Sequence, residues 1–256
     1  MKIAACFSGR IRNFEDTFPY FKKNFFDIYE VDTFFFGSPN RNGRDQNLLE
    51  FDRLYKPKKM IINDHDYYDH LDSEHKFGGP ISKMWCNIYN ANRLREEYEK
   101  ENNFKYDYVF RLRPDFFFLR TLESIDLNLE EMDDNCVMIP SRWNFSQIHP
   151  MGKSDIIGMG TSISMSKYAN LFKNINKYVY KVPTMHTGNP HPESLLGIYL
   201  NDIGLNVIPT ESPVECEYPD EIDIGSVKNK ISLPNMHIEP IIDPLLLIKY
   251  DKTLNS

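Results

Sequence analysis

Short apolar runs alternate with longer amphipathic segments along most of this 256-residue chain. Strands are predicted at 2–7, 31–36, 58–62, 106–110, 136–139, 156–165 and 207–209. Helices are predicted at 14–29, 81–101, 166–180 and 192–203. Such alternation is typical of an α/β domain whose sheet is largely parallel in its first half. Because no repeat or long linker divides the chain, we expect one domain over 1–212 and an irregular C-terminal extension over 213–256 packed on it.

The segment 81–101 gives the clearest helical pattern, because apolar residues recur along it every three or four positions. That spacing assigns Trp85 to the core. Lys83, at the start of the same helix, is expected at the surface, with contact to a phosphate as the alternative.

The most chemically specific motif is Arg-Leu-Arg-Pro-Asp at 111–115, between an apolar run and an aromatic run. Charge at the end of a buried strand is costly unless it is paired or binds a ligand. Since side chains two apart share a strand face, Arg111, Arg113 and Asp115 are expected to lie together. Two arginines and a carboxylate suit a nucleoside diphosphate, with Asp115 as a ligand of Mg²⁺ or Mn²⁺. The alternative is an internal Arg–Asp pair that only orients the loop.

A second basic motif, Ser8-Gly9-Arg10-Ile11-Arg12, follows the first predicted strand. A glycine at this place lets the backbone approach a ligand closely, and the two arginines can hold phosphates or a base. We therefore expect Ser8, Gly9, Arg10 and Arg12 to contribute to nucleotide binding. The second and third glycines of a dinucleotide-binding fingerprint are absent, and an ordinary turn with solvated arginines is the alternative.

Charge and cysteine content limit the classes of function and the compartment. The net charge of −7 argues against a nucleic-acid-binding protein. No apolar stretch approaches the roughly 18 residues of a membrane span, and the N-terminus turns polar too soon for a signal peptide. The four cysteines lie far apart without metal-binding spacing, so we expect reduced thiols and a cytoplasmic location.

Taken in order, Ser8-Gly9-Arg10 after a strand, Asp-Thr-Phe-Phe-Phe-Gly at 32–37, a long helix, and Tyr-Asp-Tyr-Val-Phe-Arg-Leu-Arg-Pro-Asp at 106–115 resemble small glycosyltransferases of the GT-A fold. Enzymes of this kind occur in bacterial surface-polysaccharide clusters and in large DNA viruses. The resemblance covers residues 1–210 and implies a Rossmann-like, mixed, mostly parallel sheet flanked by helices. It also implies a nucleotide-sugar donor such as a UDP-sugar, a glycan acceptor, and Mn²⁺ or Mg²⁺ held by an Asp-x-Asp motif. Here Arg113-Pro114-Asp115 stands in that place, so arginine replaces the first acid.

The resemblance points to further residues in the second half of the chain. Glu193, expected in the first turn of a helix, corresponds to the base of an inverting transfer, with Asp155 as the competing candidate. The alternative for Glu193 is an acid that suits the helix dipole. The glycine-bearing stretch 155–162 is expected to leave room for a sugar ring, or else to be a strand with a bulge. Ser166 is expected to cap the following helix.

Two sets of histidines and acids remain open to more than one interpretation. His186 and His191 are expected either to line the acceptor pocket, to contact phosphate, or to be polar surface. The acids and histidines of 64–72 have no partner at metal-binding spacing. A solvated acidic loop is therefore expected there, with a lid over the donor as the alternative.

The sequence thus predicts a hexosyl- or deoxyhexosyltransferase of polysaccharide biosynthesis that moves a sugar from a nucleoside-diphosphate sugar to a glycan hydroxyl. One alternative is a non-catalytic glycan-binding or scaffold protein with the same fold, which the missing first acid favours. The other is a sugar nucleotidyltransferase, for which Ser8-Gly9-Arg10 is a thin match. The sugar, the nucleotide, the stereochemical outcome and the oligomeric state are not determined by the sequence.

Overall fold

A seven-stranded sheet with the strand order β3-β2-β1-β4-β7-β6-β8 organises the protein. The computed structural model describes residues 1–39, 45–63, 79–125, 129, 132–141, 151–183 and 190–215. Its strands are β1 Lys2–Arg10, β2 Glu30–Ser38, β3 Lys59–Ile62, β4 Tyr108–Leu112, β6 Cys136–Pro140, β7 Gly158–Gly160 and β8 Asn206–Thr210. A separate pair consists of β5 Phe117–Phe118 and β9 Val214–Glu215.

The sheet is mostly parallel, with one reversed strand. β1 runs parallel to both β2 and β4, β2 runs parallel to β3, and β6 runs parallel to β8. Only β7 opposes its neighbours β4 and β6 within the described residues. The predicted α/β class with a mixed, mostly parallel sheet flanked by helices is therefore confirmed.

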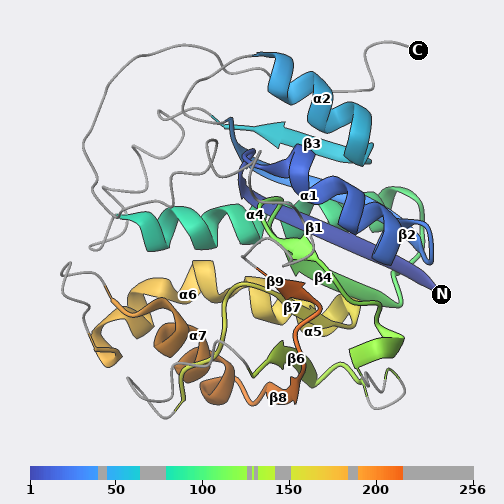
Figure 1. The fold of residues 1–256 in the computed structure, drawn as a ribbon. Helices are drawn as coiled ribbons and strands as arrows, with labels where there is room; N and C mark the ends of the chain where they lie inside the picture. The colour runs from blue at the N-terminus through green and yellow to red at the C-terminus, as the bar shows by residue number, and fades with distance from the viewer. Residues whose placement is uncertain are drawn as a thin grey trace, which may run out of the picture.

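Helices cover both faces of the sheet. They are α1 Phe14–Phe21, α2 Asp45–Tyr55, α4 Pro80–Glu101, α5 Ser162–Ala169, α6 Leu171–Tyr178 and α7 Pro192–Asp202. Along β1 the side chains alternate, so that Ala4 and Cys6 pack with α4 to α7, whereas Ala5 and Phe7 pack with α1 and α2. Figure 1 shows β1 and β4 between these two groups of helices.

Three predicted elements differ from the structure. The predicted helix 14–29 is α1 followed by a turn of π-helix at Lys22–Phe26. The stretch 45–55, which carried no predicted helix, forms α2, because Phe51 and Tyr55 lie one turn apart and stack in the core.

The predicted strand 156–165 is wrong beyond Gly160. The Thr161 hydroxyl accepts a hydrogen bond from the Ser164 amide at 3.2 Å and caps α5, so Ser166 lies inside a helix rather than at its start. Ile163 and Met165 alternate like strand residues, but Met165 and Tyr168 are buried on one helical face.

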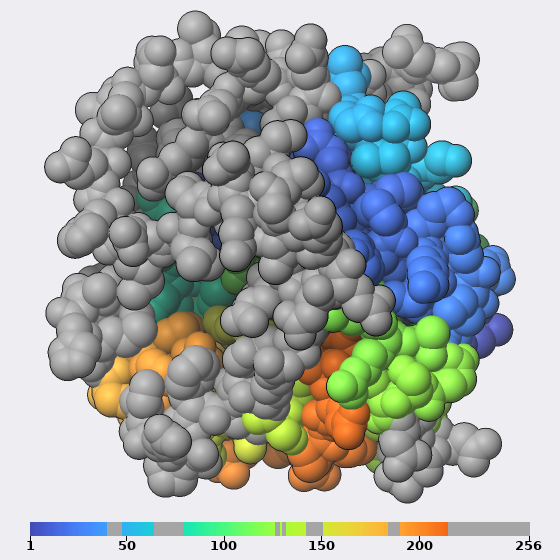
Figure 2. Space-filling model, viewed as in Figure 1, coloured from blue at the N-terminus to red at the C-terminus, as the bar shows by residue number. Residues whose placement is uncertain are grey.

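The start of the C-terminal extension is more regular than predicted. Val214 pairs with Phe118 in an antiparallel ladder, and the Leu119 amide donates to the Pro213 carbonyl at 2.8 Å. The extension therefore begins as a strand that holds the segment after β4. In Figure 2 the green residues after β4 lie against both α1 and this segment. Positions 216–256 lie outside the described residues.

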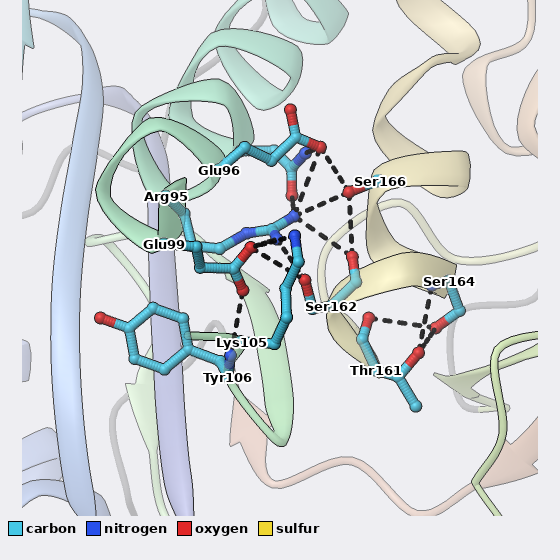
Figure 3. A network of polar contacts seen from close by, with 10 residues as sticks. Arg95, Glu96, Glu99, Lys105, Tyr106, Thr161, Ser162, Ser164 and Ser166 are labelled. Carbon is cyan, nitrogen blue, oxygen red and sulfur yellow. Dashed lines mark hydrogen bonds and ion pairs between the residues drawn. The ribbon is translucent and has the colours of Figure 1, made fainter. Parts of the chain in front are cut away.

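A buried ionic network joins α4 to α5 and to the strand β4 (Figure 3). Arg95 and Glu99 have fully buried side chains and pair at 2.8 Å. Arg95 also donates to Ser162 and Ser166 of α5, at 2.6 and 2.9 Å. The Tyr106 amide, just before β4, donates to Glu99 at 3.0 Å. The network fixes α5 relative to the central strand.

Among the described helices, none has both the length and the apolar character needed to cross a bilayer.

Candidate functional site

The sheet changes its direction of growth between β1 and β4. From β1 the chain adds β2 and β3 on one side, and it then returns through α4 to place β4 on the other side of β1. Ligands of open α/β sheets bind outside the carboxyl ends of the strands at such a switch point. The two predicted basic motifs lie at the carboxyl ends of these two strands.

Arg12 and Arg113 converge on the carboxylate of Asp115. Arg12 Nε donates to Asp115 Oδ2 at 2.6 Å. Arg113 makes a two-point contact, from Nε to Oδ1 at 2.9 Å and from Nη2 to Oδ2 at 2.8 Å. We call these three residues the arginine clamp. The structure thus brings together residues from two motifs that are 103 positions apart.

The charge of Asp115 is stabilised in a buried place. Burial on its own would raise the pKa of this carboxyl, but Arg113 and then Arg12 outweigh burial and hold the pKa below its ordinary value. The Asp115 side chain is 8% exposed, whereas the Arg12 side chain is 38% exposed. The clamp therefore presents cationic groups outward and keeps its single acid inside.

This donor set does not fit a divalent metal. Both oxygens of Asp115 accept hydrogen bonds from guanidinium groups, and a metal on either oxygen would face two cations at close range. In the described part of the chain, no three His, Cys, Asp or Glu side chains are grouped to hold a metal ion. We expected Asp115 to bind Mn²⁺ or Mg²⁺, but its contacts are those of an internal ion pair.

Helix α1 positions the turn that carries Asp115. The hydroxyl of buried Thr17 donates to the Pro114 carbonyl at 2.6 Å. Arg113 also lies over the ring of Phe116, 4.8 Å from its centroid. The rigid turn between β4 and β5 therefore holds its charged side chains in fixed orientations.

Ser8, Gly9 and Arg10 end β1 beside β2. Gly9 has φ +112°, a conformation that other residues rarely adopt, and a Cβ at Gly37 would overlap its carbonyl oxygen. Gly37 is thus needed for the close approach of the two backbones, whereas Gly9 is needed for its positive φ, because a Cβ on Gly9 would meet no described atom within 4 Å. Ser8 is buried and Arg10 is exposed at the edge of the sheet.

Arg111 is not part of the clamp, because its side chain lies on the face covered by α5. The strand ends at Leu112, so the alternation that was expected to align Arg111 with Arg113 stops there. Arg111 is buried and donates to the Ile156 carbonyl. Burial lowers the pKa of Arg111, while Tyr168 and Asp155 act in the opposite direction.

Tyr168 on α5 lies near Arg111 and Asp155, a position that the sequence prediction missed. Its ring is fully buried, and its hydroxyl and Arg111 Nε find no hydrogen-bond partner within the described residues. Helical spacing after a correctly placed cap at Thr161 would have put Tyr168 toward the sheet, but 156–165 was predicted to be a strand. Most buried polar atoms in proteins have a hydrogen-bond partner, so these two neighbouring unsatisfied atoms are a notable feature of this end of the sheet.

Asp155 and Glu193 meet at the same edge of the sheet. Asp155 precedes β7, whose first residue Gly158 pairs with Arg111 near the carboxyl end of β4. Glu193 begins α7, which is tied to this segment by a bond from the Lys153 amide to the Glu193 carbonyl at 2.9 Å. Burial, and then the charge of Asp155, raise the pKa of Glu193 to about 7. A carboxyl with this pKa can accept a proton near neutral pH.

His191 caps α7 and faces Glu193. The Ser194 amide donates to His191 Nδ1 at 3.2 Å, so the proton of the neutral ring belongs on Nε2. Nε2 lies 3.3 Å from Glu193 Oε2. His191 is buried, so the interpretation as polar surface was wrong. The two acids and this histidine form what we call the acid group: Asp155, His191 and Glu193.

The glycines of β7 do not leave room for a sugar. A Cβ on Gly158 would lie 3.3 Å from the Tyr168 ring, and a Cβ on Gly160 would overlap the Ser164 hydroxyl. Helix α5 therefore fills the space that was expected to hold a sugar ring. The glycines are required because this helix packs directly on the strand.

Some predicted residues cannot be placed. His186 and the acidic stretch 64–72 lie outside the described residues. Lys83 is half-buried in the first turn of α4, and Trp85 is fully buried in the core, as predicted.

Comparison with known proteins gives no family for this chain: no protein-family model matches it, and no curated protein is a significant match.

Proposed function

We propose that this chain is a glycosyltransferase of the GT-A type that uses a nucleoside-diphosphate sugar and a hydroxyl acceptor. The observation that carries the proposal is the arginine clamp at the switch point of the sheet, at the same edge as the half-buried Glu193 carboxyl, whose pKa is raised to about 7. The clamp suits an anionic leaving group, and the acid suits removal of a proton from an acceptor. The two activities are the two halves of a glycosyl transfer.

In this proposal, the donor diphosphate lies against Arg12 and Arg113, with Arg10 at the same edge. Guanidinium groups bind phosphate oxygens through charge-assisted hydrogen bonds. Negative charge grows on the diphosphate as its bond to the sugar breaks. Preorganised cations that stabilise this charge lower the barrier to transfer.

Glu193 is the proposed base. Its carboxylate takes the proton of the acceptor hydroxyl as that oxygen forms a bond to the anomeric carbon. The bond from the anomeric carbon to the diphosphate oxygen breaks, and the diphosphate leaves with the electron pair. His191 holds the Glu193 carboxylate from one side, and Asp155 raises its pKa. Asp155 remains the competing candidate for the base.

The test is hydrolysis and transfer with a panel of UDP-, GDP-, CDP- and dTDP-sugars, with and without simple glycan acceptors. We expect slow release of nucleoside diphosphate from one donor, accelerated by an acceptor. Glu193→Gln should retain donor binding and lower transfer by about 100-fold or more, as expected for a lost general base. Glu123→Gln, which changes an exposed acid on the segment after β5, is the matched control.

Three outcomes would contradict the proposal in different ways. Pyrophosphate-dependent turnover would indicate a nucleotidyltransferase. Glycan binding with no turnover of any donor would indicate a binding or scaffold protein. Normal transfer in the Glu193→Gln variant would remove Glu193 as the base and leave Asp155.

A further inference from the structure

We infer that the donor diphosphate is bound without a divalent metal, by Arg12 and Arg113, and that Asp115 is the internal counterion of these two arginines. This inference rests on the proposed function and specifies how the donor is held. It departs from the metal-bridged diphosphate that the Asp-x-Asp resemblance implies.

Both oxygens of the Asp115 carboxylate are already occupied by hydrogen bonds. Asp115 Oδ2 accepts from both arginines, at 2.6 and 2.8 Å, and Oδ1 accepts from Arg113 at 2.9 Å. A two-point arginine–carboxylate pair has matched geometry and is among the strongest charged contacts in proteins. A metal ion bound by Asp115 would have to break this pairing, although the Asp115 side chain is only 8% exposed.

The charges around that carboxylate also oppose a bound metal ion. Two guanidinium groups and one carboxylate leave a net positive charge, and Arg111 lies close enough for both Asp115 and Arg113 to affect its pKa. A divalent cation would sit about 2.0–2.1 Å from an oxygen of Asp115 and would add two charges to this cationic place. A diphosphate, in contrast, is negatively charged and is attracted by the net positive charge of the clamp.

Arg12 keeps hydrogen-bond donors that remain available for a ligand. Arg12 uses only Nε for Asp115, and it makes no other hydrogen bond or ion pair with the described residues. Its two terminal amino groups lie on a side chain that is 38% exposed. Asp115 thus fixes the direction of the Arg12 guanidinium through Nε while its outer N–H groups remain for phosphate oxygens. Fixing the side chain before binding reduces the entropy that binding must remove.

The experiment is calorimetric titration of the full chain with inorganic pyrophosphate, ADP, GDP, UDP, CDP and dTDP, in EDTA and again with Mn²⁺. We expect at least one nucleoside diphosphate to bind at least as tightly in EDTA as with Mn²⁺. Arg12→Gln and Arg113→Gln should each weaken this binding by roughly 10-fold or more, the usual effect of losing a charge-assisted hydrogen bond. Arg53→Gln, which breaks an exposed pair with Glu50 on α2, is the matched control and should leave binding unchanged.

The outcomes separate the inference from the proposed function. Binding that needs Mn²⁺, and loses its Mn²⁺ response in Asp115→Asn, would make Asp115 a metal ligand and overturn the inference while the transferase proposal stands. Binding in EDTA that is unaffected by Arg12→Gln and Arg113→Gln would also overturn it. Failure of every diphosphate to bind in both conditions would overturn the proposed function itself. Pyrophosphate binding without any nucleotide preference would support the clamp but place nucleoside recognition elsewhere.

Discussion

Replacing Glu99 by glutamine should destabilise the protein far more than the same change two positions away. Glu99 accepts hydrogen bonds from Arg95 at 2.8 Å, Lys105 at 2.8 Å, Ser162 at 3.1 Å and the Tyr106 amide at 3.0 Å. Arg95 and Glu99 both have fully buried side chains. The substitution removes the fully buried carboxylate that faces Arg95 and leaves only Glu96 among the described acids, which is 3.6 Å away and 37% exposed. Removing one partner of a buried ion pair costs about 3–5 kcal/mol.

The matched control is Glu97→Gln in the same helix. Glu97 pairs with Arg93 at 3.0 Å, but these side chains are 43% and 50% exposed. An exposed pair with this spacing contributes only about 0.3–0.5 kcal/mol. Both variants make the same chemical change at neighbouring places, so the difference between them measures the effect of burial.

The assay is urea unfolding followed by circular dichroism at neutral pH. We expect an unchanged dependence on urea and a lower midpoint for Glu99→Gln. A difference below about 1 kcal/mol between the two variants would refute the reasoning, because removal of a buried counterion cannot be that small.

The pH dependence provides an independent check on the same residue. Burial alone would raise the pKa of Glu99, but Arg95 and the hydrogen bonds outweigh it and hold the pKa below its ordinary value. A depressed folded pKa means that the stabilisation is present above the unfolded pKa of about 4.3 and is lost as the pH falls through the folded pKa. The difference in the free energy of unfolding between wild type and Glu99→Gln should therefore become smaller at acidic pH.

Three further predictions concern the site. The transfer rate should rise with pH through about 7 as Glu193 loses its proton, and this rise should be absent in Glu193→Gln. A wild-type transfer rate that does not change with pH would argue against Glu193 as the base. Tyr168→Phe should change the free energy of unfolding by less than about 1 kcal/mol, because it removes a hydroxyl without a described partner. A loss above about 2 kcal/mol in urea unfolding would show that this hydroxyl makes a hydrogen bond. Gly160→Ala should lower the free energy of unfolding by about 1–3 kcal/mol, because the added methyl overlaps Ser164, and it should leave diphosphate binding intact. Loss of diphosphate binding at unchanged stability would instead indicate that the glycines of β7 contact the ligand.

The sequence was most informative where local pattern and tertiary structure agree. Trp85 and its helix were predicted from spacing alone, because a long amphipathic helix needs one buried face. The clamp was predicted in outline, since motifs after two parallel strands must share an edge of the sheet. The direct pairing of Arg12 with Asp115 was not predicted, because it depends on how α1 docks on the turn after β4.

Other features could not be predicted for a physical reason. The stretch 156–165 satisfied a strand pattern over a few residues, and short apolar segments do not distinguish a strand from a helix. That error hid Tyr168 and gave the glycines of β7 the wrong role. The raised pKa of Glu193 depends on its burial and on Asp155, 38 positions earlier in the chain, and no local pattern reports such proximity.

The reversed strand β7 has a consequence for how such a chain can diversify. Everything in the arginine clamp comes from residues 12–115, and everything in the acid group comes from residues 155–193. The two groups thus come from consecutive stretches of the chain, which are joined in space by contacts such as those of Arg111 with the Ile156 carbonyl and of Arg95 with Ser162. Under the proposed function, exchanging the second stretch would change the residues that face the acceptor while the arginine clamp stays in place.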